Sequence, residues 1–148
     1  MPSHIAVVYL TIALVPLASI LTCVYALSTR SRARMRLPTI LANVAAVTAV
    51  IWASSEGPAL LEHVEQTATS AEAAAANEHA LGSANLFYAT GAMLTLVLIT
   101  VWWVLRPGRE PSVLSRIAST LLVIAAGASL ITLALVAQAG ATAVWTAA

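Results

Sequence analysis

Four long apolar segments constrain the fold of this chain more than any other feature of its sequence. They predict helices at about residues 5–27, 38–61, 70–105 and 113–139. Each contains the roughly 20 predominantly apolar residues that a helix needs to cross a hydrocarbon core of ~30 Å. Backbone polar groups in lipid must be hydrogen-bonded within the segment, which favours helices over open strands. Because short connections make successive helices antiparallel, residues 1–148 are predicted to form a single domain, an all-α, integral membrane four-helix bundle.

The composition agrees with a lipid environment and excludes several classes of function. Hydrophobic residues make up 60% of the 148 residues and charged residues only 9%, whereas soluble domains carry roughly 25% charged residues. The formal net charge is +1 and no basic stripe is interleaved with aromatic residues, so we expect no nucleic-acid partner. The single cysteine, Cys23, lies within an apolar segment, and no nucleophile–base motif is visible, so the sequence does not favour an enzyme.

The distribution of arginine predicts how the bundle is oriented in the cell membrane. The chain has no lysine, and its seven arginines lie in or beside the first and third connections. They are Arg30, Arg32, Arg34, Arg36, Arg106, Arg109 and Arg116. By the positive-inside rule these two connections are cytoplasmic in a multi-pass protein. The amino terminus, the carboxyl terminus and the connection between the second and third helices are then non-cytoplasmic.

Local signals predict several details of the helices. Thr69 and Glu72 have the spacing of a capping box, and an alanine-rich stretch follows them, which predicts an extramembrane helical extension between the second and third membrane helices. This extension either protrudes from the membrane or breaks near Gly82. Pro38 and Pro111 suit the first turns of their helices.

Small and aromatic residues suggest how the helices pack. Small residues recur at four-residue spacing around Ala46 and at Gly127–Ala128, which predicts close helix contacts. Tyr25 and the other aromatic residues near the helix ends, Tyr9, Tyr88, Trp102, Trp103 and Trp145, are expected to form interfacial belts.

The histidines gather on the side that has no arginine. His4 begins the first helix, His63 follows the second and His79 precedes or begins the third membrane span. In an antiparallel bundle these points come to the same depth. Glu56 is seven residues before His63, nearly two helical turns, and lies beside a Gly-Pro irregularity. Imidazole with carboxylate suits a transition metal ion such as zinc, iron or copper, so His4, Glu56, His63 and His79 are candidate metal ligands. A variant of this hypothesis is haem b, with His63 and His79 as axial ligands.

Short motifs resemble those of an uncharacterised family of four-helix membrane proteins, catalogued as domain of unknown function 2231. Residues 4–14, His-Ile-Ala-Val-Val-Tyr-Leu-Thr-Ile-Ala-Leu, follow the register of the pattern that opens its first helix. His4 matches the first histidine of that pattern, and Tyr9 stands at the second. Residues 55–57, Ser-Glu-Gly, and 79–82, His-Ala-Leu-Gly, are similar to the family's end of helix two and start of helix three. Relatives linked to Rieske-type iron–sulfur domains imply membrane electron transfer as the associated process.

Two functions therefore remain open at the level of sequence. The first is a membrane-embedded metal- or haem-binding protein with its site at the non-cytoplasmic end of the bundle. The second is a structural or accessory subunit of a larger membrane complex, such as a respiratory complex, with no cofactor of its own. Besides the lipid bilayer, the expected partner is another membrane protein or a second copy of this chain.

Overall fold

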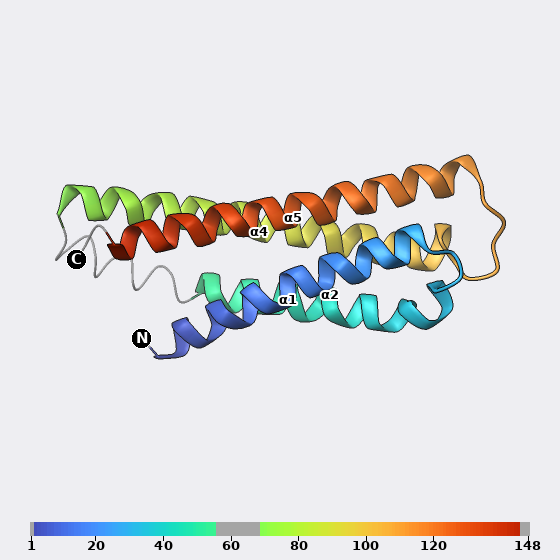
Figure 1. Ribbon diagram of the computed structural model, residues 1–148, viewed down its shortest axis with the longest axis horizontal. Coiled ribbons are helices and arrows are strands. Elements are labelled where there is room, and N and C mark those ends of the chain that lie inside the picture. The colour runs from blue at the N-terminus through green and yellow to red at the C-terminus, as the bar shows by residue number, and fades with distance from the viewer. Residues whose placement is uncertain (1, 56–68, 146–148) are drawn as a thin grey trace.

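The structure is a computed structural model that describes residues 2–55 and 69–145. Within these ranges the chain forms long helices connected in an up-and-down order (Figure 1). Helix α1 spans Pro2–Leu27 and α2 spans Arg32–Ser55. Helix α4, Ser70–Ile99, continues into a single π-helical segment, η1, at Thr100–Val104. Helix α5 spans Val113–Trp145.

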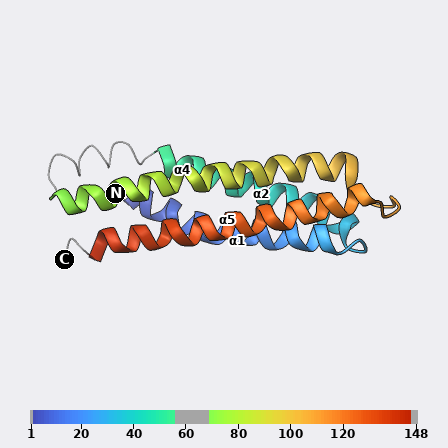
Figure 2. The ribbon, with the colours of Figure 1, turned by 90° about the horizontal axis from the view of Figure 1, so that it is seen from above.

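The helices form a closed four-membered ring. Helix α1 packs on α2 and α5, and α4 packs on the same two helices, with the closest associations between α1 and α2 and between α4 and α5. Neighbours in the ring run antiparallel (Figures 1 and 2). The beginnings of α1 and α4 and the ends of α2 and α5 therefore lie at one end of the bundle. The prediction of an all-α antiparallel four-helix bundle is confirmed.

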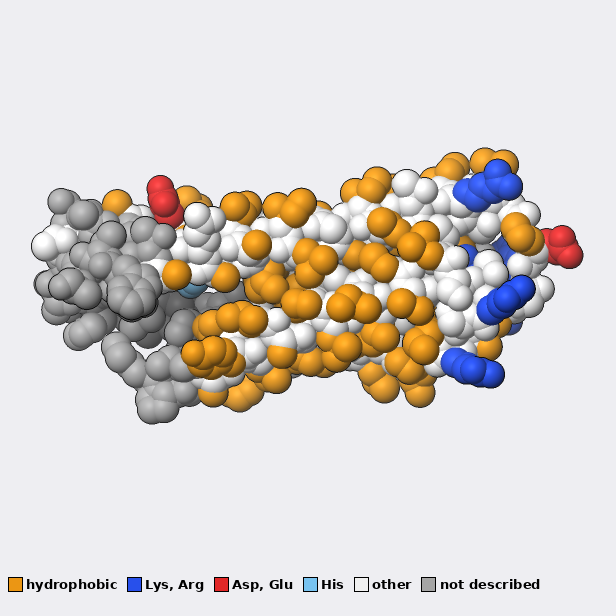
Figure 3. Space-filling model, in the orientation of Figure 1, with side chains coloured by type: hydrophobic (Ala, Val, Ile, Leu, Met, Phe, Trp, Pro, Cys, Tyr) orange, Lys and Arg blue, Asp and Glu red, His pale blue; other side chains and the backbone are white. Residues whose placement is uncertain are grey.

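The outer surface of the bundle is that of a membrane protein. Four helical segments are long and apolar enough to cross a membrane, namely Ala6–Leu27, Arg32–Ser55, Ala76–Val104 and Val113–Ala141. Hydrophobic side chains cover the flank of the bundle, and arginine side chains gather at the end away from the start of α4 (Figure 3). A continuous apolar flank of this extent is stable against lipid and not against water. The chain is thus a multi-pass membrane protein.

The predicted helical extension is also present. Helix α4 begins at Ser70, before its apolar segment begins at Ala76. It passes through Gly82 without interruption, so the alternative of a break near this glycine is wrong. The irregularity occurs instead at η1, where the N–H of Leu105 donates to the carbonyl of Thr100 at 2.7 Å.

The interior is packed with small residues and internally bonded polar groups. Ala46, Ala49 and Val50 of α2 are buried, which confirms the close packing predicted for this helix. The Asn43 amide donates to the Thr22 hydroxyl of α1 at 3.0 Å. Farther along the core, the Met93 sulfur accepts the hydroxyl of Ser129 on α5 at 3.8 Å. Such contacts hold membrane helices together where no hydrophobic driving force acts between them.

The start of α2 differs from the prediction, whereas α5 begins at Val113 as predicted. Helix α2 begins at Arg32 and not at residue 38, so Pro38 lies inside the helix and not in its first turn. The predicted range leaves out the arginine-rich segment, yet arginine is a good helix former whose long side chain reaches water from a membrane helix end. Pro111 precedes the start of α5 at Val113. Ser112 and Ser115 form the helix start instead, through reciprocal backbone-to-hydroxyl hydrogen bonds of 3.1 and 2.9 Å.

Two packing predictions are also wrong. Tyr25 is completely buried and does not belong to an interfacial belt, because its hydroxyl donates to the Leu105 carbonyl at 2.8 Å across the bundle. Tyr9 and Tyr88, in contrast, are exposed. A Cβ built on Gly127 would meet nothing within 4 Å, so this glycine makes no close helix contact. Gly82 and Gly140 do so instead, as described below.

Candidate functional site

His79 is the predicted site residue whose surroundings the structure describes most fully. It lies on α4, near the end of the bundle that has no arginine, and its side chain is half-buried. Its Nδ1 atom is 3.2 Å from the carbonyl oxygen of Val136 on α5. The imidazole therefore spans the interface between the two helices instead of pointing freely into solvent.

Two glycines make room for this contact. A Cβ built on Gly140 of α5 would lie 3.1 Å from Cε1 and 3.2 Å from Nδ1 of His79. Four residues earlier on α5, Val136 faces Gly82 of α4, whose built Cβ would lie 3.0 Å from Cγ2 of Val136. Each helix thus presents a glycine opposite a larger side chain of the other, which is how small residues bring membrane helices together.

The contact with the Val136 carbonyl indicates which ring nitrogen of His79 carries a proton. A backbone carbonyl only accepts, so the contact is a hydrogen bond only when Nδ1 carries the proton. In a neutral imidazole the lone pair is then on Nε2, which is the atom available to a ligand. Histidines that bind metals almost always donate their other ring N–H to a carbonyl, a carboxylate or water, as this one does to Val136.

The other predicted ligands are placed less completely. His4 belongs to the first turn of α1, at the same end of the bundle as the start of α4 (Figure 1). Glu56 and His63 lie outside the described residues. Within the part of the chain that the structure describes, no group of three or more histidine, cysteine, aspartate or glutamate side chains could hold a metal ion. The side chain of His4 is not among those described, so this finding does not test the predicted set of four ligands.

The partners of His79 were missed at the level of sequence. Val136 and Gly140 are four residues apart on α5 and so share one face of the helix. An isolated glycine in an apolar helix is a sign of close backbone approach. Gly140 carried that signal as clearly as Gly127 did, but the sequence alone does not say which helix faces which.

Comparisons of the chain with family models, with curated proteins and with solved structures give no match. The resemblance to the four-helix family described above therefore stays a prediction.

Proposed function

We propose that this protein is a membrane-embedded binding protein that holds a transition metal ion or haem b through His79 at the arginine-free end of the bundle. His63 is the proposed second ligand, as the other axial ligand of haem or as a metal ligand. His4 and Glu56 complete the proposed metal site. If the bound group is iron, copper or haem, its one-electron chemistry would serve membrane electron transfer.

One observation carries this proposal, namely the contact between His79 Nδ1 and the Val136 carbonyl. It orients the ring, and in the neutral tautomer that donates from Nδ1 the electron pair is on Nε2. The ring is held by the backbone of a neighbouring helix and is closely packed against Gly140. A preoriented imidazole loses little freedom on binding a ligand, as an effective ligand requires.

The proposed site faces away from the cytoplasm. This follows from the positive-inside rule, because the arginines lie at the opposite end of the bundle. We propose accordingly that the start of α1, the end of α5 and the start of α4 are non-cytoplasmic.

The test measures metal by elemental analysis and haem by visible absorbance in the purified full-length protein. We expect a stoichiometric metal or haem in the wild type and its loss in His79→Ala and in His63→Ala. His79→Asn is the decisive variant, because its amide nitrogen can take the place of Nδ1 toward Val136 while nothing replaces Nε2. It should fold as stably as the wild type and still lose the bound group.

The matched control replaces Asn77, an exposed residue two positions before His79 whose amide donates to the Ala73 carbonyl of its own helix. Asn77→Ala should keep the metal or haem. The proposal is wrong if the wild type carries neither metal nor haem in stoichiometric amount. It is equally wrong if His79→Asn retains the bound group, and retention by His63→Ala would remove His63 as the second ligand.

A second candidate function is that of a structural or accessory subunit of a larger membrane complex. The polar contacts of the core favour it, because the Asn43 amide and the hydroxyls of Ser19 and Ser129 bond to other residues of the bundle. These hydrogen bonds hold helices together. This function takes precedence if the metal and haem analyses are negative.

A further inference from the structure

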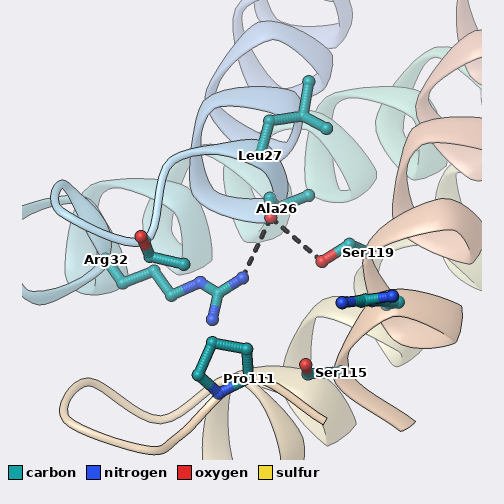
Figure 4. Close-up of a pocket in the computed structure, with 8 residues that line it drawn as sticks. Ala26, Leu27, Arg32, Pro111, Ser115 and Ser119 are labelled. Carbon is teal, nitrogen blue, oxygen red and sulfur yellow. Dashed lines mark hydrogen bonds between the residues drawn. The ribbon is translucent and has the colours of Figure 1, made fainter. Parts of the chain in front are cut away.

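At the opposite end of the bundle, α1, α2 and α5 border a small open pocket that the proposed metal site does not use. Its volume is about 280 Å³, at or just below the roughly 300–1,000 Å³ of pockets for drug-sized ligands. The pocket is formed by the end of α1, the start of α2 and the residues around the start of α5 (Figure 4). It is lined by Ala26, Leu27, Thr29, Arg32, Pro111, Ser115, Arg116 and Ser119.

Arg32 gives this pocket its chemical character. Only 7% of the residue's surface is exposed, although arginine is rarely buried without a charged partner. Its guanidinium donates from Nε to the Tyr25 carbonyl at 3.3 Å and from Nη2 to the Ala26 carbonyl at 3.0 Å. These contacts cap the carboxyl end of α1 but use two of five N–H donors, and both acceptors are neutral. A buried guanidinium is stabilised much more strongly by an anion.

The rest of the lining adds positive charge. Arg116 contributes a second guanidinium from the first turns of α5, and the amino end of this 33-residue helix carries a partial positive charge. Among the eight lining residues that the structure describes, none is acidic. Glu110, in the same connection as Pro111, is exposed to solvent and is not part of the lining. The net charge of the pocket lining is therefore positive.

The position of the pocket matches the level of lipid headgroups. Leu27, Arg32 and Val113 mark the ends of three apolar segments at this end of the bundle. The guanidinium of Arg36 stacks on the Trp102 ring, 4.1 Å from its centroid, an arrangement typical of residues at the membrane surface. Beside the pocket, Leu27 and Val113 expose apolar surface on which acyl chains can lie.

We infer that this pocket binds a phosphate group, through the guanidinium groups of Arg32 and Arg116. An anionic phospholipid headgroup and a soluble phosphate share this chemistry. The position of the pocket at the level of the lipid headgroups favours the lipid. Basic pockets between membrane helices on the cytoplasmic side bind such headgroups. The site is independent of His79, which lies toward the other end of the bundle, so it stands or falls separately from the proposed function.

The experiment measures the midpoint of thermal unfolding of delipidated full-length protein in a neutral detergent. Phosphatidylglycerol, phosphatidylcholine and inorganic phosphate are titrated separately, because a ligand that binds only the folded state raises the midpoint. We expect phosphatidylglycerol to raise it and phosphatidylcholine to leave it unchanged. Arg116→Gln should weaken the apparent affinity for phosphatidylglycerol about fivefold, the effect of one arginine near an anionic membrane surface.

The matched control is Arg34→Gln, which removes the same charge from an exposed position of α2 outside the pocket. Its affinity should change less than about twofold, within the effect of one distant screened charge. Arg32→Lys keeps the charge but removes the planar fork, and should weaken binding while the protein stays folded.

The three titrations also identify the source of the phosphate. A response to inorganic phosphate that depends on Arg116 would assign the pocket to a soluble phosphate, and a response to phosphatidylglycerol alone would assign it to the lipid. The inference is overturned if neither phosphatidylglycerol nor inorganic phosphate raises the midpoint of unfolding. It is also overturned if phosphatidylglycerol and phosphatidylcholine act alike, or if Arg34→Gln and Arg116→Gln weaken binding equally.

Discussion

At the scale of single residues, Tyr25 links the end of α1 to the end of η1. Its ring is completely buried, and its hydroxyl donates to the Leu105 carbonyl, which no longer belongs to a regular helix. Arg32 bonds to the Tyr25 carbonyl from the other side. The side chain and the backbone of one residue thus help to hold together three elements at the arginine end of the bundle.

Tyr25→Phe should lower the free energy of unfolding by about 1 kcal/mol, and by as much as about 3 kcal/mol if the Leu105 carbonyl finds no other donor. Tyr88→Phe is the matched control, because Tyr88 is 69% exposed and should tolerate the loss of its hydroxyl. Unfolding in mixed detergent, followed by circular dichroism, measures both variants. Equal stability of the two variants would show that the buried hydrogen bond contributes nothing.

The sequence identified His79 as a residue of interest but did not predict the burial of Tyr25. Both residues lie near helix ends, where tyrosine is usual at the membrane surface and histidine is usually solvated. His79 was singled out because all histidines share one side of the bundle, but its partner is a backbone carbonyl on α5, which leaves no sign in the sequence. The prediction that Tyr25 lies at the membrane surface is wrong because its hydroxyl bonds to the Leu105 carbonyl at the end of η1, a contact between distant parts of the chain.

At the scale of elements, the contact between α4 and α5 depends on two glycines. Gly82 faces Val136, and Gly140 faces His79, in both cases with no space for an added methyl group unless the neighbour moves. Because the two contacts lie on the same pair of helices, the helix separation that positions His79 is set by both glycines together.

Gly82→Ala should destabilise the protein by about 1 kcal/mol, since overpacking outweighs the gain in helix propensity. Gly127→Ala is the matched control, because its added Cβ meets nothing within 4 Å and the alanine should leave stability unchanged or raise it by up to about 1 kcal/mol. Unfolding in mixed detergent compares the two variants with the wild type. A stabilised Gly82→Ala variant would contradict the close packing of α4 on α5.

Element types and their order could be predicted because four apolar segments of sufficient length allow only helices in a bilayer. The residues at which the helices begin and end were harder to predict from the sequence. The start of α2 at Arg32 was missed because hydropathy treats arginine as a loop residue, whereas here the guanidinium caps the preceding helix. The start of α5 at Val113 agrees with the prediction, but Pro111 lies before its first turn, which Ser112 and Ser115 form through hydroxyl hydrogen bonds that many serine pairs do not make.

At the scale of the whole molecule, the two ends of the bundle are chemically different. Arginine side chains and the phosphate pocket are at one end, and His79 with the start of α1 is at the other. The orientation predicted from the arginines would place the phosphate pocket at the cytoplasmic leaflet, where anionic lipids are abundant, and the proposed metal site on the opposite side of the membrane. The assignment of the arginine end to the cytoplasm is a prediction of the positive-inside rule.

The most direct test of this orientation uses two exposed glutamates, Glu78 on α4 and Glu110 before α5, which lie toward opposite ends of the bundle. Each is replaced by cysteine in a Cys23→Ala background, so that both variants lose one acid and carry one thiol. Intact cells, or spheroplasts if an outer barrier is present, are treated with a membrane-impermeant thiol reagent. We predict labelling of Glu78→Cys in intact cells and labelling of Glu110→Cys only after lysis. The reverse pattern would contradict the orientation and would move the proposed metal site to the cytoplasm.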